Sequence, residues 1–160
     1  MVEVLGRPRK DEEDRFERTA KLLGGTRVLK RKVKDGFDAH NLIVVGLPGK
    51  ALTYLVDCLV VIKPSESLGK AVGISTRTLQ RRKDDPDKPL DTERSGRTWK
   101  FAEILARATD VFGAQEEAEA WLEKPAIGLN NEKPIDLLST PAGLEMLEAH
   151  LTRIEYGVYT

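Results

Sequence analysis

Four apolar side chains recur at three- and four-residue intervals near the end of the chain: Leu144, Leu147, Leu151 and Ile154. This spacing places them on one face of a helix. Thr140 and Pro141 precede them and suit a helix start, because a threonine hydroxyl accepts a free backbone amide and proline fits the first helical position. Gly157 suits the other end, so the pattern predicts a helix over residues 140–156.

Apolar periodicity predicts further helices over most of the chain. They cover residues 11–23, 50–62, 99–112, 114–123 and, as one short turn, 134–138. Residues 38–45 fit a helix or a strand, and the helices around them favour a helix. We expect Trp121 to be buried against Phe112 and Leu147. The predicted fold class is all-α.

Residues 65–83 carry the signals of two short helices joined by a tight turn. Ser65 and Ser75 can each cap a helix, and Gly73 can supply the positive φ angle that the turn requires. In the second helix, residues 76–83, Leu79 is the one apolar side chain, so most of the surface is polar or basic. A helix, a glycine turn and a short basic helix form the helix-turn-helix arrangement of DNA-binding proteins.

The second of these helices supplies the candidate DNA-binding residues: Ser75, Thr76, Arg77, Thr78, Gln80, Arg81 and Arg82. Arg, Gln and Thr in a first helical turn can read base edges, whereas a serine cap and later arginines can hold phosphates. Three aspartates that follow the helix oppose this interpretation, because carboxylates are repelled by phosphate; they are Asp84, Asp85 and Asp87. Residues 84–97 contain two prolines and Gly96, and we expect them to connect two domains.

Charge is distributed unevenly along the chain, although the formal net charge is zero. Residues 1–34 carry 11 basic and 6 acidic side chains, and residues 75–100 carry 8 and 5. Residues 101–160 carry 4 basic and 11 acidic side chains. A basic front and an acidic back suggest two partners of opposite charge, and an unevenly charged solvated surface is the simpler alternative.

The residue patterns that enzymes and metal sites usually need are missing. His40 and His150 lie far apart, and the single cysteine, Cys58, sits among apolar residues where we expect it to be buried. No nucleophile triad or glycine-rich phosphate loop occurs. An apolar run of about 18 residues and a signal-peptide pattern are also missing. We expect a cytoplasmic protein that makes no membrane contact and has no catalytic residue, metal or cofactor.

Several segments together resemble the Xre antitoxins of RES–Xre toxin–antitoxin modules, and the wider group with an MbcA/ParS-type toxin-binding domain. The segments that carry the resemblance are residues 73–82, 111–113, 118, 121–122, 134–140, 143 and 151–157. Asn130 and Asn131 stand where the family often has glycines, whose left-handed backbone asparagine can adopt. Arg82 is polar where many helix-turn-helix sequences have an apolar residue.

The resemblance implies a two-part protein. A helix-turn-helix domain over residues 38–90 would bind its own promoter as an autorepressor, and a toxin-binding domain over residues 91–160 would neutralise a RES toxin that degrades NAD. Residues 1–37 form a basic N-terminal extension without a family signature. We also expect a homodimer on palindromic DNA and a higher-order toxin–antitoxin complex. The alternative is a dimeric helix-turn-helix transcription regulator that has no toxin partner.

The last residues are the candidate toxin-binding segment: Arg153, Glu155, Tyr156, Gly157, Val158, Tyr159 and Thr160. A chain end is usually polar, whereas this one carries two tyrosines and a valine. We expect residues 155–160 to extend into or across the toxin's NAD pocket, where the acidic domain and the chain carboxylate complement the positive charge that holds a diphosphate. Arg153 would act differently and pair at the rim of the pocket or with a carboxylate of the toxin. The alternative is that Val158 and Tyr159 pack back onto their own domain.

Overall fold

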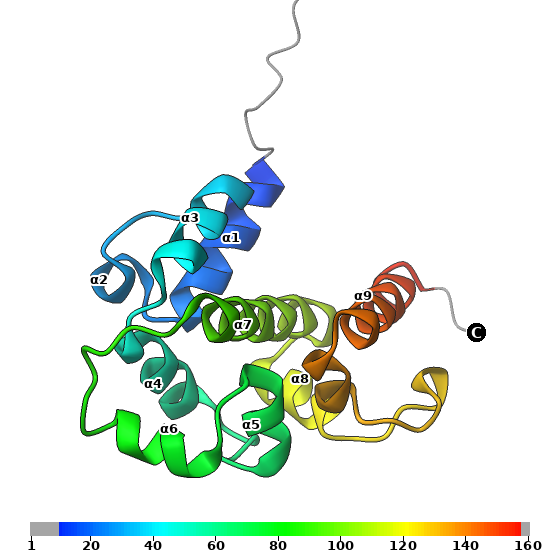
Figure 1. Cartoon of the computed structure of the whole chain (residues 1–160). Helices are drawn as coiled ribbons and strands as arrows, with labels where there is room; N and C mark the ends of the chain where they lie inside the picture. Colours follow the sequence, from blue (N-terminus) through cyan, green and yellow to red (C-terminus); the bar gives the residue numbers. More distant parts are fainter. Residues whose placement is uncertain (1–9, 158–160) are drawn as a thin grey trace, which may run out of the picture.

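The helix α7 (Thr92–Phe112) runs through the centre of the molecule, and the other helices are arranged around it (Figure 1). The computed structural model describes residues 10–157, which contain helices and no β-strand, so the predicted all-α class is confirmed. The helices before α7 are α1 (Lys10–Leu22), α2 (Gly25–Leu29), α3 (Gly36–Val45), α4 (Gly49–Cys58), α5 (Glu66–Val72) and α6 (Thr76–Arg82). Those after it are α8 (Gln115–Leu122), the 3-10 helices η1 (Ile127–Leu129) and η2 (Pro134–Ser139), and α9 (Pro141–Glu155).

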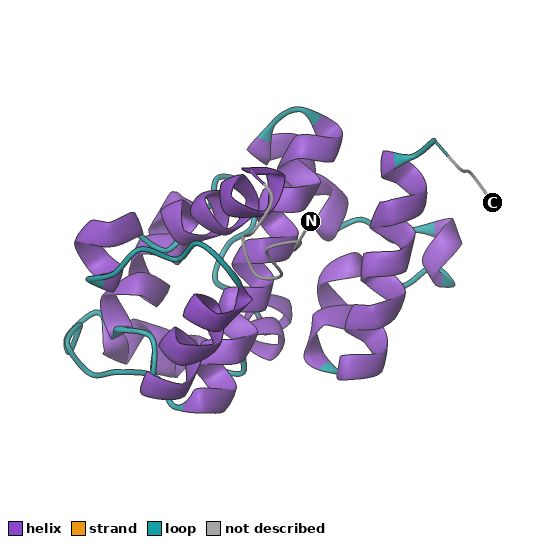
Figure 2. Ribbon diagram, turned by 90° about the horizontal axis from the view of Figure 1, so that it is seen from above, coloured by secondary structure: helices purple, strands orange, loops and turns teal. Residues whose placement is uncertain are grey.

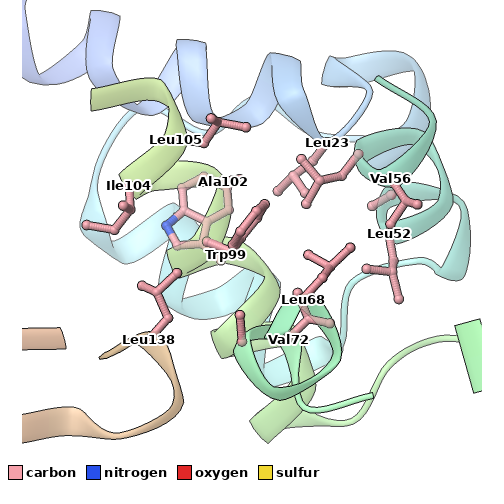
Figure 3. Packing of buried hydrophobic residues seen from close by; sticks show 14 of the residues in the cluster. Leu23, Leu52, Val56, Leu68, Val72, Trp99, Ala102, Ile104, Leu105 and Leu138 are labelled. Carbon is pink, nitrogen blue, oxygen red and sulfur yellow. The ribbon is translucent and has the colours of Figure 1, made fainter. Parts of the chain in front are cut away.

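The apolar core is built around α7. Helices α1, α3, α5, α8 and α9 all pack against it, and the buried apolar side chains form one continuous cluster. Figure 3 shows side chains of α4, α5, α7 and η2 pointing into one cluster, which includes Trp99, a residue that is 4 % exposed. Each large side chain buried in this way contributes about 1.5–3 kcal/mol, so the packing on α7 contributes substantially to stability.

Helix α7 begins at Thr92, so the predicted start at residue 99 was wrong. The Asp91 carboxylate caps the helix by accepting the amide of Arg94 at 2.8 Å. Gly96 lies inside the helix and packs near Ile43, although the sequence suggested that it belongs to a connecting segment. The division of the chain at residues 37/38 and 90/91 stays a prediction, and α7 contacts helices on both sides of the second boundary.

Helix α4 ends at Cys58, although the apolar pattern predicts a helix as far as residue 62. The amides of Val60, Val61 and Ile62 point instead at the carboxylate of Glu119 in α8, with N–O distances of 2.9–3.1 Å. A partner distant in sequence therefore ends the helix.

Other sequence-based predictions are confirmed at the level of single hydrogen bonds. Residues 36–45 are helical, because Asp35 caps α3 by accepting the amide of Asp38 at 2.9 Å. Thr140 caps α9 by accepting the amide of Gly143 at 3.0 Å. On the apolar stripe of α9 the two central leucines are fully buried, and Leu144 and Ile154 are half-buried.

Helices α6 and α9 lie on opposite sides of α7 (Figure 1). In the view from above, α9 lies at the edge of the molecule (Figure 2). The two sets of candidate binding residues therefore belong to separate surfaces.

Candidate functional site

Helices α5 and α6 form the tight two-helix unit that the sequence predicts. The Ser65 hydroxyl accepts the amide of Leu68 at 3.3 Å, and the Ser75 hydroxyl accepts the amide of Thr78 at 3.2 Å. Gly73 ends α5 with a φ of 76°, a left-handed angle that suits glycine. A Cβ atom on Gly69 would lie 2.7 Å from the Ile74 carbonyl oxygen, so this turn packs against α5 more closely than a side chain allows.

The polar face of α6 is exposed. Leu79 is 5 % exposed and anchors the helix, whereas Ser75, Arg77, Gln80 and Arg81 are exposed. The candidates Thr76 and Thr78 are half-buried. Neither Arg77 nor Arg81 takes part in an ion pair with the rest of residues 10–157. Both guanidinium groups are thus available to a partner.

Arg82 differs from the other candidate residues, because it points inward and is 8 % exposed. Its Nη1 donates to the Lys88 carbonyl oxygen at 3.2 Å, and its buried Nε has no partner in the described part of the chain. Arg82 follows Leu79 by three residues and so lies on the same, inner face of the helix. This geometry does not support the expected phosphate contact of Arg82, which instead closes the loop after α6.

Two arginines of α7 hold the turn between α5 and α6. Arg94 Nε donates to the Gly73 carbonyl oxygen at 3.2 Å. Arg97 donates from Nη1 to the Lys70 carbonyl oxygen at 3.1 Å and from Nη2 to the Ser139 carbonyl oxygen at 3.3 Å. Arg97 therefore joins the end of α5 to the end of η2. Sequence reasoning missed both residues, because they fell in the segment expected to be a linker.

Glu119 makes a second link between the front and back halves and is fully buried. Besides the three amides of residues 60–62, its carboxylate accepts Gln115 Nε2 at 2.9 Å, and the same Nε2 donates to the Cys58 carbonyl oxygen. Cys58 itself is half-buried rather than buried. Glu119 carried no signal in the sequence, since the neighbouring residues Glu116, Glu117 and Glu123 are acidic as well.

Trp121 was predicted to be buried, but it is half-buried. Its ring lies 5.1 Å from the Phe112 ring, as expected, and stacks on the ring of His150 at 6.2 Å with an interplanar angle of 6°. Burial and the nearby positive charge of Arg153 lower the pKa of His150 from its ordinary value. The cluster of Phe112, Trp121 and His150 joins α7, α8 and α9.

The candidate toxin-binding residues at the end of α9 differ in their exposure and contacts. Arg153 and Tyr156 are exposed, and Gly157 turns the chain with a φ of 71°. Glu155 is paired with α7, because Arg107 Nη2 lies 3.2 Å from its carboxylate. The predicted residues Val158, Tyr159 and Thr160 lie outside the described residues.

Between residues 10 and 157, no group of three His, Cys, Asp or Glu side chains is placed to hold a metal ion. None of the helices in that range is long and apolar enough to span a membrane.

Comparison with known proteins relates the back half to toxin binding. Residues 107–157 match the model of the antitoxin Xre/MbcA/ParS C-terminal toxin-binding domain. An antitoxin Xre of Yersinia enterocolitica is 32 % identical over 132 residues, which cover 72 % of this chain and 88 % of that protein. An antitoxin Xre of Pseudomonas putida is 33 % identical over 128 residues, covering 79 % and 76 %. A Prs ADP-ribosylating antitoxin of Sphingobium is 30 % identical over 98 residues, covering 56 % and 61 %.

Proposed function

Since the chain belongs to the Xre antitoxin family, we propose that it neutralises a RES-type toxin that consumes NAD, and that it represses the promoter of its own operon. The observation that carries the first part is the toxin-binding domain matched over residues 107–157. The second part rests on the exposed basic face of α6. The alternative, a transcription regulator without a toxin partner, would leave this domain without a ligand.

The negative charge of the back half supports the proposal that it binds at the NAD site of a toxin. Residues 101–160 carry 11 acidic and 4 basic side chains. An enzyme that binds NAD must hold a diphosphate, so the entrance of its pocket is expected to be positive, and opposite charges speed and orient association. Because Arg107 holds Glu155, we assign Glu155 the role of fixing the end of α9. Tyr156, which is 75 % exposed, and the residues after Gly157 would then enter the pocket.

A truncation tests this mechanism. The toxin encoded beside this chain's gene is co-expressed with the full chain or with a chain that ends at Tyr156, and growth and cellular NAD are measured. We expect the full chain to preserve NAD and the truncated chain to lose most of that protection, with an unchanged melting temperature. If the truncated chain protects NAD as well as the full chain does at equal concentration, residues 157–160 do not block the pocket.

The fate of the NAD identifies the toxin's chemistry. The name of the Sphingobium relative refers to ADP-ribosylation of Prs, which also consumes NAD. NAD labelled in its adenine separates the two reactions, because degradation leaves the label in small molecules and ADP-ribosylation transfers it to protein. We expect the label to stay in small molecules. A toxin that leaves NAD intact would exclude both chemistries.

Promoter binding is tested on α6. Replacing Arg77 and Gln80 together with alanine should weaken binding to the duplex upstream of the operon by about 1–3 kcal/mol per lost base contact. Arg81→Ala should weaken binding to every sequence and reduce the salt dependence, because a phosphate contact carries no base information. Arg153→Ala is the matched control, since Arg153 is also exposed and belongs to α9, which lies on the opposite side of α7 from α6 (Figure 1). Unchanged promoter binding by the double variant would exclude α6 as the reader.

A single short helix reads only a few base pairs. We therefore propose that two copies of the chain bind a palindromic operator, with the two α6 helices in successive major grooves. Sedimentation of the protein–DNA complex gives the number of chains per duplex. One chain per operator would overturn the dimer.

A further inference from the structure

The matched toxin-binding residues carry exposed apolar side chains on η1 and in the middle of α9, as well as at the end of α9. Within residues 107–157, the large apolar side chains that are exposed are Ile127 at 91 %, Met146 at 54 % and Tyr156 at 75 %. Ile127 begins the 3-10 turn η1, and Met146 lies in the middle of α9, on which that turn packs. Ile127 and Met146 thus stand on two elements that pack on each other, and exposed side chains of this size in a binding domain are typical of a contact surface.

A groove of about 420 Å³ is lined by Met146 and by Gly128, the residue that follows Ile127. Leu129 and Gly128 of η1 line one side, and Met146 of α9 lines the other together with two small residues, Ala142 and Ala149. The small residues stand seven positions apart on the outer face of α9, opposite the buried leucine stripe, and leave room between them.

The turn beside the groove is held in a defined shape. Asn130 and Asn131 adopt left-handed φ angles of 57° and 61°, as the sequence predicts, and the Asn131 amide donates to the Ala126 carbonyl oxygen at 2.9 Å. A Cβ atom on Gly128 would lie 2.5 Å from Cε1 of His150, so the turn lies directly on α9. Ile127 is therefore presented by a preorganised element, which lowers the entropy cost of binding.

Charged groups flank the groove. Glu145 and Arg153 line it, both are exposed, and neither takes part in an ion pair among the described residues. A partner that fills the apolar centre would best carry an acidic group facing Arg153 and a basic group facing Glu145. Tyr156 follows Arg153 by about one helical turn, so the groove leads towards the end of α9.

We propose that the groove between η1 and α9 is a second docking site for the toxin, outside its NAD pocket. An apolar side chain on a protruding helix or loop of the toxin fills the groove, while the chain end reaches the pocket. This inference rests on the proposed function, and the toxin is the occupant because every residue of the groove lies inside the matched toxin-binding segment. The groove would supply affinity for the toxin, and the last residues of the chain would inhibit the toxin by blocking its NAD pocket.

Two substitutions test the groove. Ile127→Asp replaces the exposed apolar side chain next to the groove residue Gly128 with a charge, and Ala149→Arg fills the space between the small residues. The toxin encoded beside this chain's gene is separated from the purified complex, refolded and titrated with each variant. We expect each variant to raise the Kd by roughly 10- to 100-fold, as the loss of an interface anchor does. Phe37→Asp is the matched control, because Phe37 is 81 % exposed on α3, outside the toxin-binding domain, and its Kd should stay within about 2-fold of the parent.

The possible outcomes are distinguishable. If the parent chain does not bind the toxin, the proposed function fails and the groove with it. If the parent binds and the groove variants bind equally well, the groove is not a docking site, although the proposed function stands. If Ile127→Asp changes the sedimentation of the chain alone from dimer to monomer, the groove joins two copies and the inference is overturned. Should Ala149→Arg fail to fold, Ile127→Ala replaces it, because an exposed side chain can be shortened without loss of packing.

Discussion

Replacing Glu119 with alanine removes an acceptor that four N–H groups share in the interior. Three of these groups are the backbone amides of residues 60–62, and the fourth is the Nε2 of Gln115. The carboxylate ends α4 and attaches the loop after it to α8, which belongs to the back half of the chain. The substitution therefore tests whether this buried charge stabilises the contact between the two halves.

The size of the effect follows from the exposure of the donors. Ile62 is 2 % exposed, so its buried amide would lose the hydrogen bond to Glu119, at a cost of about 1–3 kcal/mol. Val60 and Val61 are 57 % and 38 % exposed, and water can replace most of what their amides lose. The missing methylene groups leave a small cavity, whereas removing a buried charge regains part of its desolvation cost. We expect the free energy of unfolding to fall by about 2–4 kcal/mol.

Urea unfolding followed by circular dichroism measures this difference directly. Glu119→Gln keeps one acceptor oxygen but turns an NH₂ group towards the remaining donors, so its loss should be intermediate. Glu117→Ala on the exposed side of the same helix is the matched control and should stay within about 0.5 kcal/mol of the parent. If Glu119→Ala unfolds at the same urea concentration as Glu117→Ala, the carboxylate contributes nothing net and the reasoning fails.

Three further predictions concern the back half. Gly143→Ala would place a Cβ atom 2.3 Å from the Leu137 carbonyl oxygen, so it should lower the free energy of unfolding by about 1–3 kcal/mol; an unchanged urea midpoint would contradict this close packing. Trp121→Ala should cost about 1.5–3 kcal/mol, less than for a fully buried tryptophan, and a parent-like melting temperature would show that its stacking on Phe112 does not contribute. Because the pKa of His150 is lowered in the fold, the unfolded chain takes up the proton first as the pH falls below the ordinary value of 6.5, and stability should decrease there. His150→Gln should weaken this pH dependence, and the same slope in both proteins would exclude His150 as its source.

Local signals determined most of the helices and the two-helix unit of the candidate DNA-binding surface. Ser65, Ser75 and Thr140 cap the helices that follow them, and Gly73 has the predicted positive φ angle. Each of these features depends on residues within a few positions in the chain, so the sequence alone contains the needed information. The same holds for the exposed face of α6, because one buried residue, Leu79, sets which side faces outward.

Features that depend on distant partners could be decided only by the tertiary structure. Arg82 looks like a phosphate ligand in the sequence, yet packing turns it towards the Lys88 carbonyl oxygen. Glu119 looks like a solvated carboxylate, yet it accepts amides that lie 57–59 positions earlier in the chain. The groove beside α9 forms because the η1 turn packs against that helix. The apolar pattern of the sequence does not predict this contact. Periodicity reports which side of an element is apolar, whereas the choice of polar partners follows from how the elements are packed in space.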